Sequence, residues 1–140
     1  MYNISNEIIP QDKRKEINDK ILFLIDNNLC EQYGVTQQDV YDGYTGDGHL
    51  HGLNFNDFNN YHEFSEAKRQ YENGQFFTSP HILQFISQCI KPLNTDVIAD
   101  FTSGKGDFFN FCPVHSNCYS NELDIKAYKI QKFLYPNVNI

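Results

Sequence analysis

Apolar residues recur at helical spacing in the first third of the chain and predict a helix there, and a capping pattern predicts a second. Between residues 12 and 30 they return every three or four positions, which indicates an amphipathic helix. Thr36, with Asp39 three positions later, forms a capping-box pattern that predicts the start of a short helix extending through Tyr41. Gly34 lies between these two helices, where a helix end favours left-handed backbone geometry.

Two further helices are predicted before residue 92. Asn56 or Asp57 should cap the first of them, and Gly74 should end it. Its apolar side is an aromatic stripe that we expect to lie in the core, formed by Phe58, Tyr61, Phe64 and Tyr71. The second helix should begin at Pro80, because proline is favoured in a first turn, and should end before Pro92.

The last third of the chain alternates predicted strands with predicted helices. Residues 97–100 form a short apolar run ending in an acid, which is typical of a buried strand, and residues 117–121 form a second strand. A helix is expected over residues 124–134, and residues 136–140 have the pattern of an entry to a third strand. This order predicts an α/β fold with a parallel sheet and right-handed crossovers, preceded by a helical N-terminal region.

The charge of the chain is unevenly distributed. Residues 1–80 hold thirteen acids and six bases and so account for the whole net charge of −7. Residues 21–67 contain eight acids and no Lys or Arg, so this segment should not hold a phosphate backbone by itself. It is either a solvated face or a surface that docks on a basic protein partner.

Cysteine and histidine give two weak metal-site candidates. Cys112, His115 and Cys118 are three potential zinc ligands without an evident fourth, and we expect the two thiols to pack in the core instead. His49 and His51 alternate with glycine, and we expect them to form hydrogen bonds rather than to bind metal. All four cysteines are expected to be free thiols of a cytoplasmic protein, because the N-terminus has no secretory leader.

No segment of the sequence predicts contact with a membrane. A membrane-spanning helix needs about 18 or more consecutive apolar residues, and every apolar run in this chain is far shorter.

The strongest candidate for a ligand site follows the first predicted strand. Asp100 ends that strand, Gly104 and Gly106 make a tight glycine pair, and Glu122 comes sixteen residues after Gly106. Glycine lets the backbone approach a ligand closely, and a carboxylate after the next strand can accept hydrogen bonds from ribose hydroxyls. This order suits a nucleoside cofactor.

Three segments in this order resemble the beginning of a known enzyme family. They are Gly74–Pro80, Asp100–Gly106 and Asn121–Asp124. Together they are similar to an adenine-specific DNA methyltransferase of the S-adenosylmethionine-dependent, Rossmann-like class. The similarity is greatest to the N-terminal part of large methylase proteins, often fused to helicases, that phages and mobile elements carry. It extends from about Tyr41 to the end of the chain.

The resemblance implies a domain division and a cofactor site. Residues 1–73 would be a helical N-terminal region, and residues 74–140 the first half of a cofactor domain whose partial Rossmann-like sheet has three short parallel strands. The residues around S-adenosylmethionine would be Phe77, Thr78, Asp100, Thr102, Gly104, Gly106 and Glu122. Thr78 would contact the cofactor carboxylate, and Glu122 would bind the ribose hydroxyls.

Three of these residues also have an ordinary structural interpretation. Thr78 could cap the helix that begins at Pro80, and Asp100 could bond only to loop amides. Glu122 could be a surface acid at a strand end.

The chain departs from the family pattern in two ways: its loop has unusual residues, and the motif that positions the target amine is missing. Phe101 replaces the usual proline, and Lys105 fits the loop if its side chain points to solvent. Neither Asn-Pro-Pro nor Asp-Pro-Pro, which would position the target amine, occurs in the 140 residues. No catalytic residue is therefore assigned, and we expect weak cofactor binding and no methyl transfer by the chain alone.

Two functional hypotheses remain open, and with them the question of whether the chain belongs to an enzyme. In the first, it is the S-adenosylmethionine-binding N-terminal segment of an adenine-specific DNA methyltransferase that acts on DNA as part of a longer protein. In the second, it is a complete, non-catalytic relative from a phage or mobile element that inhibits a host defence nuclease or restriction enzyme through acidic residues 21–67. An open third strand also suggests a homodimer or another partner.

Overall fold

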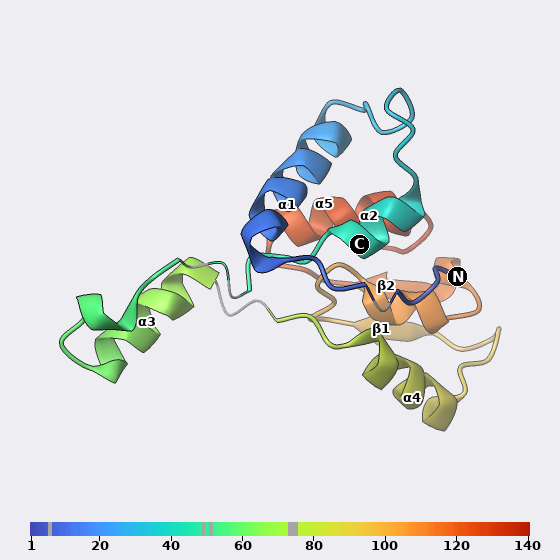
Figure 1. Cartoon of the computed structure of the whole chain (residues 1–140). Coiled ribbons are helices and arrows are strands. Elements are labelled where there is room, and N and C mark those ends of the chain that lie inside the picture. Colours follow the sequence, from blue (N-terminus) through green and yellow to red (C-terminus); the bar gives the residue numbers. More distant parts are fainter. Residues whose placement is uncertain (6, 49, 51, 73–75) are drawn as a thin grey trace.

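The computed structural model describes residues 1–5, 7–48, 50, 52–72 and 76–140 of the chain. Helices account for about half of these residues, and all but α3 lie around a small parallel sheet (Figure 1). The α-helices are α1 (Gln11–Asp26), α2 (Gln37–Gly43), α3 (Tyr61–Glu72), α4 (Pro80–Ile90) and α5 (Ile125–Leu134). The strands are β1 (Ile98–Asp100) and β2 (Cys118–Ser120), and the 3₁₀-helices are η1 (Phe55–Asp57), η2 (Asp107–Phe111) and η3 (His115–Asn117).

The sheet is parallel, as predicted, but shorter than expected. β1 pairs with β2 from Ile98 opposite Cys118 to Asp100 opposite Ser120. The segment expected to form a third strand contributes a single bridge, between Asn139 and Tyr119. A mixed α/β fold with a parallel sheet is thus confirmed, whereas the third strand is reduced to one bridge. A turn closed by the Val138 amide precedes Asn139, and Asn139 is the residue of this segment that bonds to β2.

The core lies between the sheet and three helices. α1, α2 and α5 pack against one another on one side of the sheet, and α4 packs against η2 on the other (Figure 1). α5 presents Ala127, Ile130 and Leu134 at helical spacing to this core, each at most 2% exposed. The side chains of Val40, Tyr41 and Tyr44 enter it from α2 and its C-terminal end.

Local signals in the sequence account for the start and end of several helices. The predicted capping box is present: the Asp39 amide donates to the Thr36 hydroxyl, and the Thr36 amide donates to the Asp39 carboxylate. The Thr36 hydroxyl and the Thr36 amide both donate to the Asp39 carboxylate, and these two hydrogen bonds keep the pKa of the Asp39 carboxyl below its ordinary value. α4 spans the predicted residues between Pro80 and Pro92. α1 is shorter than predicted, because Asn28 already adopts left-handed geometry with φ of 55°.

The predicted cap of α3 was wrong. Asn56 and Asp57 lie in η1, and the helix begins later, at Tyr61. The Asn60 side chain accepts a hydrogen bond from the Glu63 amide at 3.0 Å and therefore acts as the cap. Gly74, the expected end, lies outside the described residues.

The aromatic stripe of α3 does not enter the core, contrary to the prediction. α3 extends away from the rest of the chain (Figure 1), and Tyr61 is 72% exposed. The rings of Phe55, Phe58 and Tyr61 instead cluster around Phe64, with centroid distances of 5.6, 5.6 and 6.4 Å. Periodicity identified the apolar face of the helix correctly, but this face packs on neighbouring aromatic residues of its own segment.

Gly106→Ala should destabilise the fold by about 2–4 kcal/mol, combining left-handed strain with overpacking. Gly106 has φ of 85°, and an added Cβ would lie 2.9 Å from the Gln131 side chain and 3.0 Å from the Tyr135 ring. Gly34→Ala is the matched control, because Gly34 has φ of 66° but no atom within 4 Å of the added Cβ. It should cost only about 1–2 kcal/mol. Urea unfolding followed by circular dichroism measures both values, and equal losses would contradict the packing role of Gly106.

Candidate functional site

Three segments that are distant in the sequence line one open cleft. The segment before α4 forms one wall, and the loops after β1 and β2 form the others. The cleft has a volume of about 770 Å³ and is lined by Phe76, Phe77, Thr78, Phe101, Thr102, Gly104, Asn121, Glu122, Leu123, Asp124 and Ile125. A recess of about 70 Å³ shares five of these residues and is also lined by Leu83, Asp100, Ser103, Asp107 and Phe108.

The structure brings six of the seven predicted cofactor residues to these two spaces. The six are Phe77, Thr78, Asp100, Thr102, Gly104 and Glu122. Gly106 lines neither space, because it is buried behind the loop against Gln131 and Tyr135. Its contribution is to let the loop approach α5 closely.

Glu122 bridges the two loops of the cleft. Its carboxylate accepts a hydrogen bond from the Gly104 amide at 2.6 Å and another from the Asp124 amide at 2.8 Å. The side chain is half-buried, so it is more than a solvated acid at a strand end. Each carboxylate oxygen has two lone pairs, which leaves acceptor capacity on both oxygens for further donors.

The Phe77 ring packs so closely on Gly104 that a larger residue at position 104 would need the ring to shift. Gly104 has φ of 56°, and a Cβ added there would lie 3.0 Å from the Phe77 ring. The same ring lies 6.0 Å from the ring of Tyr44, measured between centroids. Phe77 therefore rests on the glycine loop on one side and on the N-terminal region on the other.

Asp100 has the structural role that the sequence suggested, whereas Thr78 does not. Asp100 accepts a hydrogen bond from the Thr102 amide at 3.1 Å, so it does bond to the loop, while also lining the recess. Thr78 is exposed, and the N-cap position of α4 belongs to Ser79. Thr78 therefore is not the cap, and its side chain lines the cleft.

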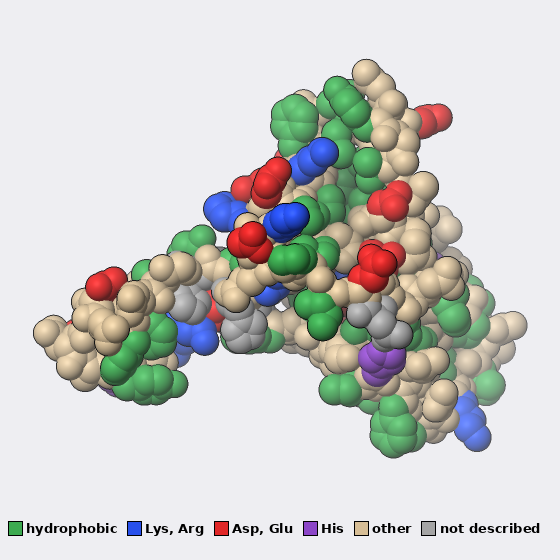
Figure 2. Space-filling model, viewed as in Figure 1, with side chains coloured by type: hydrophobic (Ala, Val, Ile, Leu, Met, Phe, Trp, Pro, Cys, Tyr) green, Lys and Arg blue, Asp and Glu red, His purple; other side chains and the backbone are tan. Residues whose placement is uncertain are grey.

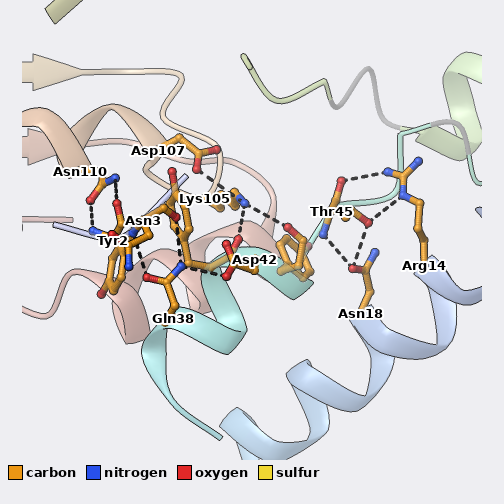
Figure 3. A network of polar contacts seen from close by, with 12 residues as sticks. Tyr2, Asn3, Arg14, Asn18, Gln38, Asp42, Thr45, Lys105, Asp107 and Asn110 are labelled. Carbon is orange, nitrogen blue, oxygen red and sulfur yellow. Dashed lines mark hydrogen bonds and ion pairs between the residues drawn. The ribbon is translucent and has the colours of Figure 1, made fainter. Parts of the chain in front are cut away.

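Lys105 does not point to solvent, which corrects the expectation for this loop. Its side chain is buried, and the ammonium donates to the carbonyls of Tyr41 at 2.8 Å and Tyr44 at 3.2 Å (Figure 3). The Asp107 carboxylate lies 3.6 Å away, and the centre of the Tyr41 ring 4.8 Å away. The last carbonyls of a helix lack intrahelical partners and attract cations, which explains the direction of this side chain.

The lining of the cleft is acidic and apolar. The carboxylates that line the cleft and its recess belong to Asp100, Asp107, Glu122 and Asp124, and no Lys, Arg or His is among the described residues that line either space. Apolar side chains at the cleft are well exposed, as shown by 71% for Phe101, 97% for Leu123 and 61% for Ile125. Such a cleft suits a neutral or cationic ligand with an aromatic part and disfavours phosphate.

The acidic N-terminal segment finds part of its counter-charge within the chain. Lys129 and Lys126 of α5 pair with Asp26 and Asp47, each at 2.7 Å. On the face shown in Figure 2, acidic and basic side chains are interspersed over α1. Two of the acids that could dock on a basic partner are thus already engaged.

Cys112 and Cys118 pack in the core, as expected. Burial raises the pKa of the Cys112 thiol to about 12 and also raises that of Cys118. His115 is directed to the Phe109 carbonyl at 2.9 Å. Within the described part of the chain, no three His, Cys, Asp or Glu residues are grouped so that they could hold a metal ion. His49 and His51 lie outside the described residues.

Comparison with known proteins gave no match: no family model, curated protein or solved structure is significantly similar to the chain. The α-helices among the described residues include none long and apolar enough to cross a membrane.

Ellman's reagent should modify one thiol rapidly in the native protein and four in denaturant. Cys89 is exposed, whereas Cys30, Cys112 and Cys118 are buried, and burial raises the pKa of each of these three thiols. A buried neutral thiol reacts slowly, because the thiolate is the nucleophile. Cys89→Ser should abolish the rapid phase. Two or more rapid thiols in the native protein would contradict the burial of Cys30, Cys112 and Cys118.

Proposed function

We propose that the cleft binds S-adenosylmethionine and that the chain is the cofactor-binding N-terminal segment of an adenine-specific DNA methyltransferase. The observation that carries this proposal is the contact between Glu122 and the Gly104 amide, in a cleft that together with its recess has four carboxylates and no Lys, Arg or His among its described lining residues. Transfer to DNA is proposed for a longer protein, since the motif that would position the target amine is absent from these residues.

The charge of the cleft supports this cofactor over other nucleoside ligands. Dinucleotides and nucleoside triphosphates place phosphates at a glycine loop, where cations and helix N-termini stabilise them. Here the only lysine of the loop is turned away and bonded to carbonyls, and the acids line the cleft. S-adenosylmethionine has no phosphate and carries a sulfonium cation, so it suits the acidic lining.

The shape of the lining supports one orientation of the ligand. The unused lone pairs of Glu122 are acceptors for the two ribose hydroxyls, and Leu123 and Ile125 offer apolar surface to the adenine. The methionine end would then lie toward Phe77 and Thr78, next to the N-terminus of α4. A helix N-terminus favours a carboxylate, such as the one at the methionine end of the cofactor. In this orientation each end of the cofactor therefore lies beside groups that complement it.

Binding should be weak, with a dissociation constant of about a millimolar. Several features limit the affinity. The cleft is open, its apolar side chains are mostly exposed, and each hydrogen bond contributes only about 0.5–1.5 kcal/mol net. The cost of association is at least several kcal/mol.

Titration of ¹⁵N-labelled protein with S-adenosylmethionine and with ATP tests the proposal. S-adenosylmethionine should shift the amide signals of Gly104 and Asp124, which donate to Glu122, and ATP should not at equal concentration. Glu122→Gln should weaken binding about tenfold or more, because an amide N–H then faces one of the two backbone donors. The matched control is Glu31→Gln, an exposed acid outside the cleft.

Two results would overturn the assignment. One is ATP binding as tightly as S-adenosylmethionine. The other is Glu122→Gln binding the cofactor with unchanged affinity while Gly104 still shifts.

A further inference from the structure

The helical N-terminal region contacts the glycine loop through one buried cation. Lys105 donates to the carbonyls of Tyr41, in α2, and Tyr44, just after it. α2 has no basic residue in its last turn, so Lys105 supplies a cation that the helix itself lacks. A buried ammonium is costly unless it is paired, and its position therefore depends on these carbonyls and on Asp107.

The contact continues from α2 to α1. The Thr45 amide donates to the buried Asn18 side chain at 3.0 Å, and Arg14 donates to the Thr45 hydroxyl at 2.9 Å (Figure 3). Asn18 also donates to the Gly46 carbonyl at 2.8 Å. Residues 44–46 are therefore held between α1 and Lys105, so that α1, α2 and the glycine loop form one hydrogen-bonded unit.

The same loop residues also face the cleft. The Gly104 amide bonds to Glu122, while the adjacent Lys105 side chain bonds to the end of α2. Phe77 covers Gly104 and touches Tyr44 from the other side. A displacement of α2 would thus leave Lys105 with Asp107 as its remaining partner and shift the backbone donor that positions Glu122.

We propose that Lys105 is a positioning residue that couples ligand binding in the cleft to docking of the N-terminal helical region. The proposal rests on the S-adenosylmethionine site described above. Because such coupling is reciprocal, docking of α2 strengthens ligand binding, and the ligand strengthens docking of α2 by the same factor. The N-terminal region then contributes to cofactor binding, although none of its described residues lines the cleft.

Hydrogen exchange of the full chain, with and without saturating S-adenosylmethionine, measures the coupling. In the unmodified protein the ligand should slow exchange of the amides at the C-terminal end of α2, such as that of Tyr44, which donates to the Val40 carbonyl. Lys105→Met should speed exchange in α2, leave α5 protected, and weaken S-adenosylmethionine binding at least about fivefold, the lower end of typical couplings. Lys132→Met, which removes an exposed lysine of α5, is the matched control and should change neither quantity.

The outcomes separate this proposal from the cofactor assignment. If S-adenosylmethionine binds the unmodified protein without slowing α2 exchange, the coupling is wrong and the cofactor site stands. This arm decides the question even if Lys105→Met fails to fold. Unchanged affinity in a folded Lys105→Met variant also overturns the coupling. If the unmodified protein binds no S-adenosylmethionine, the cofactor site and the coupling both fail, while α2 exchange in Lys105→Met still reports whether Lys105 holds the helix.

Discussion

One buried ammonium group joins the helical N-terminal region to the glycine loop. Lys105 lies at the point where the loop after β1, the end of α2 and the Asp107 carboxylate meet. Burial raises the pKa of Asp107, and the nearby ammonium opposes this shift, so each charge makes the other less costly to bury. Without this contact, the C-terminal carbonyls of α2 would lose their cation, and the helical region would be held to the loop mainly by apolar packing.

The local structure could be predicted from the sequence wherever a short-range signal decides it. The Thr36 capping box, the proline at the start of α4 and the strand before Asp100 all have their cause within a few residues. The third strand was not predictable in the same way, because its extent depends on how the turn before Asn139 meets β2. The exposed aromatic face of α3 illustrates the same limit, since a periodic pattern identifies an apolar face but not the surface that covers it.

Most residues of the candidate site could be predicted from the sequence, but the charge of its lining could not. The spacing of Asp100, Gly104 and Glu122 was enough to expect them at one edge of the sheet, and the loops after the strands do meet there. The direction of Lys105 was missed because it is set by carbonyls some sixty residues earlier in the chain. The sequence held one signal for this direction: α2 has no basic residue in its last turn, so its C-terminal carbonyls needed a cation from elsewhere. With the lysine turned away, the cleft is acidic, and this feature is the basis for proposing a sulfonium cofactor rather than a phosphate ligand.

A crystal structure of the chain soaked in S-adenosylmethionine tests the central claim most directly. The account predicts that both ribose hydroxyls donate to the Glu122 carboxylate, that the adenine lies against Leu123 and Ile125, and that the Lys105 ammonium stays on the Tyr41 and Tyr44 carbonyls. A ligand bound elsewhere, or a Lys105 side chain turned into the cleft to contact it, would contradict the account.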